Sequence, residues 1–306
     1  MQTEPLSTPL PTTELPNPNT ENLDRLPTEE MLTRINEEDA RVAQAVRAAL
    51  PAIARAVDAI AEKLRDGGRL IYVGAGTSGR LGILDAAECL PTFSVSPEQV
   101  FGIIAGGERA MIRAVEGAED DREAGEAAMD THAVSAKDAV VGISASGGAP
   151  YVRGAVTRAR AQGAVTISVA NSPNAPLSGD VEIPIEVVTG PEVIAGSTRL
   201  KAGSAQKMVL NMLSTGAMVR IGKTYGNRMV DVQATNAKLV ARSRRLVREI
   251  GQAESDSEAD RFLEMAGGSV KLAIVIARRG VSAEQAAQIL RESGGFLSVA
   301  LGEGQV

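Results

Sequence analysis

Three glycine-rich segments that also carry hydroxyl side chains could bind an anion. They are Gly74-Ala-Gly-Thr-Ser-Gly-Arg80, Gly106-Gly-Glu108 and Ser144-Ala-Ser-Gly-Gly148. Small residues let backbone N–H groups approach an anion, hydroxyls add donors, and the N-terminus of a following helix favours negative charge. Two such loops acting together predict a phosphate ester that is bound without a metal ion.

The first of these segments also fits two nucleotide-binding patterns in part. Gly74–Gly79 matches G-x-G-x-x-G, but a dinucleotide site needs an acid at the end of the second strand to hold the ribose. That strand ends in Ile103-Ile-Ala-Gly-Gly107, and Glu108 lies past two glycines. The triphosphate pattern G-x-x-x-x-G-K-[ST] is absent because Arg80 follows Gly79. The pattern therefore favours a phosphosugar over a dinucleotide.

Two acidic positions could supply general acid–base chemistry. Glu88 lies in Ile83-Leu-Asp-Ala-Ala-Glu-Cys89, where apolar neighbours favour partial burial and a raised pKa. A salt bridge at the rim of the protein explains the same pattern equally well. Glu119 lies in Val115-Glu-Gly-Ala-Glu-Asp-Asp121, and four acids in six residues are typical of a solvated turn. The pattern alone does not select Glu119.

A third unusual segment, Glu192–Lys207, gathers hydroxyls, a glutamine and three cations at the start of a predicted long helix. A polar helix start with surface cations would look the same. Gly-Ser-Thr is a poor helix former, which favours a helix N-terminus that faces a ligand. We therefore expect Glu192, Ser197 and Lys201 to contribute to substrate binding.

Composition narrows the class of protein. The net charge of −6 and the 2% aromatic content provide neither a basic field nor a stacking platform for nucleic acid. Cys89 is the only cysteine, which argues against a disulfide framework and a cysteine-based zinc site. We expect Cys89 to be buried, and His132, the only histidine, to be exposed. No signal peptide or membrane span is recognisable, so the expected location is the cytoplasm.

The elements that must position these loops alternate between strand and helix. Strands are expected at 69–73, 101–104, 139–143, 165–169 and 181–185, the last at an edge because of Pro184. Helices are expected at 38–65, broken or kinked at Pro51, and at 81–89, 151–162 and 201–221. This alternation predicts an α/β core with a mostly parallel sheet, in which ligands bind beyond the carboxyl ends of the strands.

Both ends of the chain differ from this core. The proline-rich residues 1–27 predict an extended arm that is either disordered or laid over a partner surface. Helical patterns at 239–250, 256–266, 269–279 and 282–292 predict a small C-terminal all-helical module. We expect an N-terminal arm with helices at 1–58, a phosphosugar-binding domain at 59–225 and the helical module at 226–306.

Several long segments together resemble the N-acetylmuramic acid 6-phosphate etherase family. The resemblance covers nearly the whole chain from about Thr13, far more than a single glycine motif, and the mammalian glucokinase regulator is similar in fold but is not expected to carry the full set. The segments are Tyr72–Cys89, Ala114–Asp120, Gly190–Gly203, Gly222–Asn227 and Asp231–Leu239.

The resemblance implies a sugar isomerase (SIS) fold and a homodimer whose active site lies near the interface. The implied reaction cleaves the D-lactyl ether of N-acetylmuramic acid 6-phosphate, giving N-acetylglucosamine 6-phosphate and D-lactate, in the recycling of bacterial wall sugars. The two catalytic glutamates of the family map onto Glu88 and Glu119. The residues expected around the phosphate and sugar are Gly76, Thr77, Ser78, Gly79, Ser144, Ser146 and Gly147.

The implied chemistry needs no redox cofactor and no metal. Glu119 would remove the C2 proton of the open-chain aldehyde, and protonated Glu88 would protonate the departing lactate. The sequence leaves open which glutamate is the acid. Ala149 stands where the family often has threonine, so one phosphate donor is lost. A non-catalytic phosphosugar sensor and a sugar-phosphate isomerase remain alternatives.

Overall fold

A computed structural model describes residues 10–232 and 237–304 of the protein. Contacts between residues group the chain into two compact units. The sheet unit contains the residues up to Ala86 and Glu98–Leu213, and the helical unit contains Ala87–Pro97 and the residues from Ser214. The three-part domain division expected from the sequence stays a prediction. The Asp231–Leu239 motif lies partly outside the described residues.

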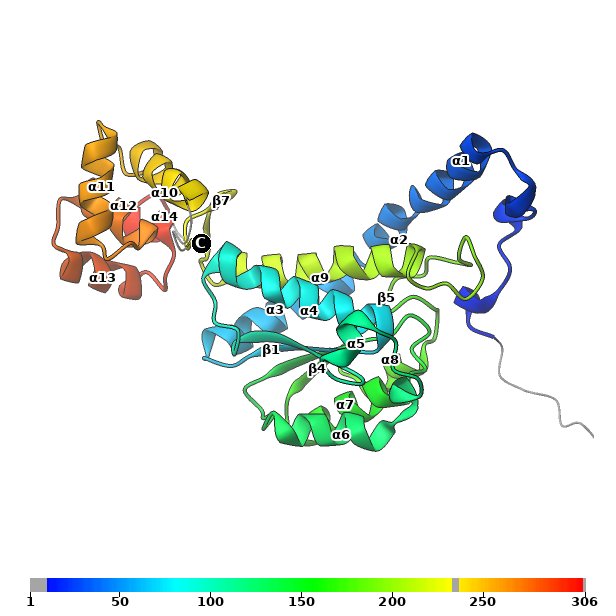
Figure 1. The fold of residues 1–306 in the computed structure, drawn as a ribbon. Helices are drawn as coiled ribbons and strands as arrows, with labels where there is room; N and C mark the ends of the chain where they lie inside the picture. Colours follow the sequence, from blue (N-terminus) through cyan, green and yellow to red (C-terminus); the bar gives the residue numbers. More distant parts are fainter. Residues whose placement is uncertain (1–9, 233–236, 305–306) are drawn as a thin grey trace, which may run out of the picture. The chain divides into compact units, whose positions relative to one another are not determined.

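The sheet unit is built on five parallel strands in the order β2-β1-β3-β4-β5 (Figure 1). This confirms the predicted parallel α/β core, including the position of the Pro184 strand at an edge. The strands are β1 (Leu70–Gly74), β2 (Val100–Ile104), β3 (Ala139–Ile143), β4 (Val165–Ala170) and β5 (Ile183–Glu186).

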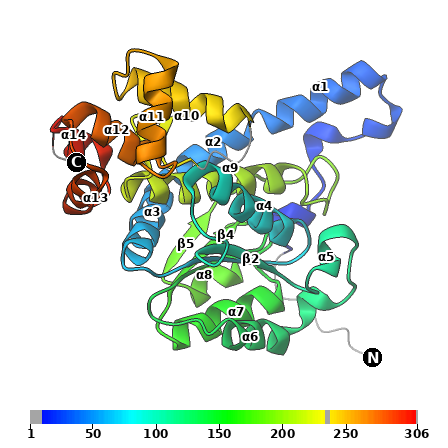
Figure 2. The same cartoon turned by 60° about the vertical axis from the view of Figure 1, so that its left-hand side comes forward.

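Helices cover both faces of this sheet, which is why its central strands are apolar on both sides. Ile71, Val73 and Val140 point to one face and pack with the apolar side of α7 (Pro150–Ala161). Tyr72 lies on the opposite face, where α4 (Gly76–Phe93) passes so close that a side chain at Gly82 would contact it. Figures 1 and 2 show α3 (Leu50–Arg65) on the α4 side and α6 (Arg122–Thr131) with α7 on the other.

The helical pattern predicted at 38–65 is divided, as Pro51 predicts. Pro51 lies in the first turn of α3, where its missing N–H costs no hydrogen bond. The preceding helices are α1 (Thr28–Asp39) and α2 (Val42–Ala48). The remaining helices of the sheet unit are α5 (Arg109–Ile112), α8 (Pro176–Asp180) and the start of α9 (Lys201–Arg220).

The described part of the N-terminal arm packs on its own chain, which corrects the expectation of a disordered arm. Contact of the arm with a partner surface stays a prediction. Residues 10–27 contain three short 3-10 helices, η1 (Thr12–Glu14), η2 (Pro18–Thr20) and η3 (Leu23–Arg25). The carbonyl of Thr13 accepts a hydrogen bond from the N–H of Gly196. The Thr20 hydroxyl donates to the carbonyl of Val193 at 2.9 Å. Residues 1–9 lie outside the described residues.

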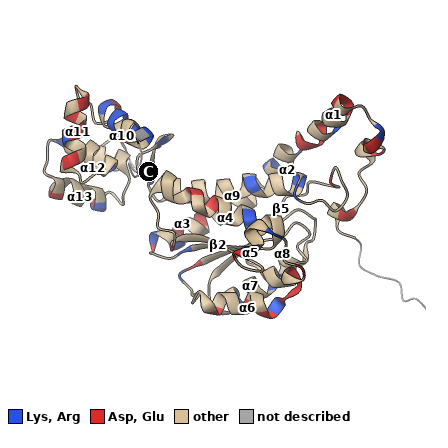
Figure 3. Cartoon of the chain, in the orientation of Figure 1, with Lys and Arg blue, Asp and Glu red and all other residues tan. Residues whose placement is uncertain are grey.

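The helical unit confirms the four predicted C-terminal helices. Serine side chains cap three of them at Ser255, Ser269 and Ser282. Its elements are β6 (Thr224–Tyr225), β7 (Arg228–Met229), α10 (Ala237–Glu249), α11 (Asp256–Met265), α12 (Val270–Arg279), α13 (Ala283–Glu292) and α14 (Leu297–Leu301). The β6–β7 hairpin and α14 were not predicted. Lys and Arg gather on α10 (Figure 3), where Arg244 pairs with Asp260 and Arg248 with Asp256.

Candidate active site

A cavity of the sheet unit lies where the strand order reverses. The chain runs from β1 outward to β2 and then returns to β3 on the other side of β1. β1 and β3 are paired neighbours, but the connections that follow them run in opposite directions, to β2 and to β4. This leaves a crevice beyond the carboxyl ends of the two strands, which is the usual ligand site of this sheet type. The residues after β1 and β3 line a cavity of about 390 Å³ at this point.

The first wall of this cavity is the start of α4. The helix begins at Gly76, directly after Ala75, so the predicted Gly74–Gly79 loop is mostly a first helical turn. The first N–H groups of a helix have no partner within it and attract an anion. Gly76, Thr77 and Ser78 line the cavity. Gly79 is not among the described lining residues. A side chain there would collide with Ile104 and with the carbonyl of Gly74, so this glycine allows close packing of α4 on the sheet.

The second wall is the loop after β3. Ser144 and Ser146 line the cavity, and their hydroxyl oxygens accept hydrogen bonds from the N–H groups of Gly147 and Gly148, both at 3.1 Å. Accepting from the backbone leaves each serine proton free for a ligand. Gly147 turns away from the cavity, with φ of +73° and a close approach to Ala175. Its N–H is already used, so it shapes the loop.

Carboxylates supply the charged groups of the cavity. Glu119, in the 3-10 helix η4 (Ala118–Asp120), lines it together with Asp120 and Glu14 of the arm. Among the described residues that line it, none is Lys or Arg. A phosphate here would therefore be held by neutral donors and the α4 dipole, and Glu119 would remain available as a base.

Glu88 lies elsewhere. It is exposed on α4, about three helical turns beyond Thr77, and is not among the described residues that line this cavity. The expected partial burial of Glu88 was wrong, because Cys89 and Ala86 take the inward side of the helix while Ala87 and Glu88 face outward. Cys89 is buried and His132 is exposed, as predicted.

The start of α9 uses its polar groups internally. The buried Glu192 carboxylate accepts hydrogen bonds from the N–H groups of Lys201 and Ala202 at 2.8 and 2.9 Å. It occupies the place where an anion would bind at this helix N-terminus. Burial raises the pKa of Glu192, and these two hydrogen bonds oppose the rise. Neither Glu192, Lys201 nor Ser197 lines the cavity, although Gly196 and Thr198 do.

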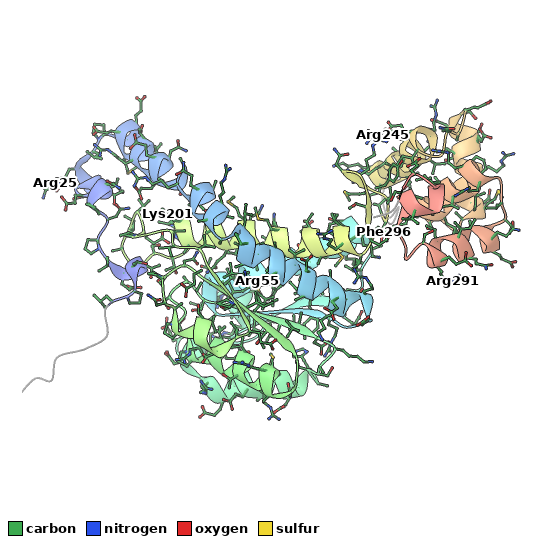
Figure 4. The ribbon with its side chains drawn as sticks, turned by 180° about the vertical axis from the view of Figure 1, so that it is seen from behind. Arg25, Arg55, Lys201, Arg245, Arg291 and Phe296 are labelled. Carbon is green, nitrogen blue, oxygen red and sulfur yellow. The ribbon has the colours of Figure 1, made fainter. Side chains whose placement is uncertain are left out.

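Lys201 is committed to a second buried glutamate. Its Nζ donates to Glu38 at 2.5 Å, and both side chains are nearly inaccessible, at 3% and 2% exposed (Lys201 is labelled in Figure 4). Asn17 and Asn19 of the arm each donate to the same carboxylate at 2.8 Å. Burial alone would raise the pKa of Glu38, but the hydrogen bonds from Lys201, Asn17 and Asn19 outweigh it and lower the pKa to about 2. This ionised cluster fastens the arm to α9.

Sequence reasoning missed two residues of this region and included one segment that contributes little. Glu14 was overlooked because the arm was expected to be extended, and Glu38 because it is one of several acids on a polar helix. The Gly106-Gly107-Glu108 segment forms an exposed turn and lines no part of the cavity. Only its glycine content suggested a role.

Residues 10–232 and 237–304 hold no group of three His, Cys, Asp or Glu side chains arranged to bind a metal ion. Within the same residues, every helix is too short or too polar to cross a bilayer.

Comparison with known proteins identifies relatives over almost the full length. The family model described as glucokinase regulatory protein N-terminal SIS domain matches residues 52–160, and the SIS domain model matches residues 118–216. N-acetylmuramic acid 6-phosphate etherase from Aeromonas hydrophila is 54% identical over 286 residues, which is 94% of this chain and 96% of that protein. The etherase from Mycolicibacterium smegmatis is 53% identical over 292 residues, covering 95% and 98% of the two chains. A solved phosphoheptose isomerase from Francisella tularensis matches with a TM-score of 0.49 and 18% identity, over 63% of this chain and 98% of that chain.

Identity above one half across nearly the whole of both chains is too extensive to come from a shared fold alone. The hydroxyl loops of the switch-point cavity and Glu119 lie within residues 52–160 and 118–216, which the family models match. The chain belongs to the N-acetylmuramic acid 6-phosphate etherase family, and its sheet unit is a SIS domain.

Proposed function

We propose that this protein is a cytoplasmic carbon–oxygen lyase that cleaves the D-lactyl ether of N-acetylmuramic acid 6-phosphate in the recycling of cell-wall amino sugars. One observation carries the proposal beyond family membership. Glu119 lines the same cavity as the side chains of Thr77, Ser144 and Ser146. A phosphate-binding wall and a carboxylate base therefore face one space of sugar-phosphate size.

The phosphate is bound by neutral donors. The Ser144 and Ser146 hydroxyls keep their protons for it, and the first N–H groups of α4 point into the same space. Thr77 adds a hydroxyl from the opposite wall.

The first half of the reaction is an elimination. The sugar opens to its aldehyde, which makes the C2–H bond acidic. The Glu119 carboxylate takes the C2 proton, a C2–C3 double bond forms, and the C3–O bond breaks. Glu88 protonates the departing lactate oxygen. The products of this half are D-lactate and an α,β-unsaturated aldehyde.

The second half adds water. The carboxylate form of Glu88 removes a proton from water as its oxygen attacks C3, and Glu119 returns a proton to C2. Ring closure gives N-acetylglucosamine 6-phosphate, and both glutamates recover their starting forms. The net change is addition of one water across the ether bond.

The position of Glu88 supports a homodimer in which this residue serves the partner's cavity. Glu88 faces solvent on α4, and Leu84, one turn earlier on the same helix side, is 50% exposed. An exposed leucine beside an exposed catalytic acid suits burial against a second chain. Each active site then takes Glu119 from one chain and Glu88 from the other.

The activity is tested by adding purified protein to N-acetylmuramic acid 6-phosphate with EDTA present and no nucleotide. We expect equal amounts of D-lactate and N-acetylglucosamine 6-phosphate. Saturable binding without lactate would instead identify a phosphosugar sensor, and exchange of the C2 proton without lactate would identify an isomerase.

The shared site is tested by mixing two inactive variants, Glu88→Gln and Glu119→Gln. If each site combines residues of two chains, a mixed dimer has one intact site of two. Random reassortment then restores about a quarter of the wild-type activity, because half the dimers are mixed. Both glutamates acting within one chain would give no recovery on mixing. The variants mixed without subunit exchange serve as the baseline.

A further inference from the structure

A chain of buried hydrogen bonds runs behind the cavity and connects its two walls. The Ser78 hydroxyl donates to Oε1 of Gln206 on α9 at 2.9 Å. Nε2 of Gln206 donates to Oδ1 of Asn171, directly after β4, at 2.9 Å. Nδ2 of Asn171 donates to the carbonyl of Val187 at 3.2 Å, and its backbone N–H donates to the carbonyl of Ala145. The side chains of Ser78, Gln206 and Asn171 are all buried.

The Val187 carbonyl, at one end of these hydrogen bonds, fixes the direction of each of them. The Val187 carbonyl can only accept, so the NH₂ group of Asn171 must face it. Oδ1 of Asn171 then faces Gln206 and requires its NH₂ group, which leaves Oε1 of Gln206 facing Ser78. Reversing either amide would place two acceptors or two donors together in a buried setting, which costs free energy at both ends.

The consequence is a difference between Ser78 and the serines of the β3 loop. A hydroxyl has one proton, and Ser78 uses its proton in the hydrogen bond to Oε1 of Gln206. Ser144 and Ser146 instead accept from the backbone and keep their protons. Ser78 therefore lines the cavity with an oxygen that has no proton to offer an anion, while the N–H groups of its helical turn remain available.

We propose that Gln206 and Asn171 are positioning residues that hold the first turn of α4 in place for phosphate binding, with Ser78 as their anchor and not a hydroxyl donor to the phosphate. The proposal rests on the proposed function, since it assumes that a phosphate occupies the cavity. It extends that function by assigning roles to Gln206 on α9 and Asn171 after β4, which are not among the described residues that line the cavity but bond to Ser78 and Ala145, which are.

The sharpest variant is Gln206→Glu, which has the same shape. An ionised glutamate accepts the Ser78 proton as well as glutamine does, but it has no proton to donate to Oδ1 of Asn171. We expect KM and the dissociation constants for inorganic phosphate and N-acetylglucosamine 6-phosphate to rise about tenfold, as for the loss of roughly one well-placed hydrogen bond, with kcat changed far less. Ser204→Ala, an exposed change two residues away on α9, is the matched control.

A double-mutant cycle with Ser78→Ala separates an anchor from a phosphate ligand. If Ser78 acts through Gln206, the double variant binds inorganic phosphate no more weakly than the weaker single variant. Additive losses, or a loss in Ser78→Ala with none in Gln206→Glu, would overturn the proposal. Urea unfolding of each variant confirms that the fold is retained, and Ser78→Ala carries the test if Gln206→Glu does not fold.

Failure of the two proposals can be told apart. A wild-type protein that binds neither inorganic phosphate nor N-acetylglucosamine 6-phosphate would contradict the phosphate site itself. A wild-type protein that binds both, with Gln206→Glu unchanged, would contradict only the positioning role.

Discussion

The cavity between β1 and β3 and the start of α9 have similar compositions but opposite uses. Both combine glycine, hydroxyl side chains and a helix N-terminus, and both were expected to face a ligand. At the cavity, Ser144 and Ser146 keep their protons and α4 leaves its first N–H groups open. At α9 the carboxylate of Glu192 already occupies the helix N-terminus, and Lys201 is paired with Glu38.

Composition therefore identifies hydrogen-bond donors but not their partners. A helix N-terminus binds an external anion only if the chain does not supply one of its own. Glu192 lies nine residues before the N–H group that it caps, so no short-range pattern reveals the pairing. The same residue types therefore build a ligand site in one place and a rigid support in the other.

The largest effect is expected from removing the base of the cavity. Glu119→Gln should lower kcat for lactate release by about 10²- to 10⁴-fold, the usual contribution of a general base, with little change in stability. Glu123→Gln, an exposed change on the neighbouring α6, is the control. Activity near that of the wild type in Glu119→Gln would contradict the assignment of Glu119 as the base and of this cavity as the active site.

Breaking the buried Lys201–Glu38 pair at the start of α9 should lower stability and leave the catalytic step largely unchanged. Lys201→Met leaves Glu38 buried without its cation, and we expect the free energy of unfolding to fall by about 3–5 kcal/mol in urea titrations. Arg41→Met removes the exposed partner of the same carboxylate and should cost at most about 1 kcal/mol. Equal effects of the two changes would show that burial does not set the strength of this cluster.

The two buried glutamates should respond to pH in opposite directions. Because the pKa of Glu38 falls from 4.5 to about 2 on folding, it contributes about 3 kcal/mol above pH 4.5, which is lost as the pH falls through 2. The raised pKa of Glu192 contributes stability at low pH that is lost as the pH rises through its folded value.

Urea titrations of Glu38→Gln and Glu192→Gln between pH 2 and 7 measure both contributions. Glu38→Gln should be much less stable than the wild type at pH 7 and should approach it in acid. The free energy of unfolding of Glu192→Gln should be close to that of the wild type at pH 7 and should fall below it in acid. Parallel pH profiles for the two variants would contradict the assigned pKa directions.

The smallest effect concerns Ala149, which lines the cavity as the N-cap of α7 and makes no side-chain cap. Ala149→Thr adds a hydroxyl that can donate to phosphate or cap the helix. We expect roughly fivefold tighter binding of N-acetylglucosamine 6-phosphate, about 1 kcal/mol, measured by calorimetry. Unchanged binding with higher stability would mean that the hydroxyl serves the helix instead.

Much of the fold could be predicted because its signals are local. The five apolar strands and the glycine-rich segments between them predict a parallel sheet with a ligand crevice, and Pro51 predicts the division of the long helical pattern. The position of Glu88 could not be predicted so well. Its apolar neighbours suggested burial, but the side of α4 that faces the core depends on long-range packing. The pairs Glu38–Lys201 and Ser78–Gln206 join residues more than a hundred positions apart, which no pattern in the sequence reveals.

The attachment of the arm has a practical consequence for anyone who makes this protein in the laboratory. A shortened version that starts at Thr28, the first residue of α1, would look reasonable from the sequence because the deleted segment is proline-rich. It would remove Asn17 and Asn19 from the Glu38 carboxylate and Glu14 from the cavity wall. A truncated enzyme could then be less stable and less active for reasons unrelated to its catalytic residues, so purification tags belong upstream of an intact arm.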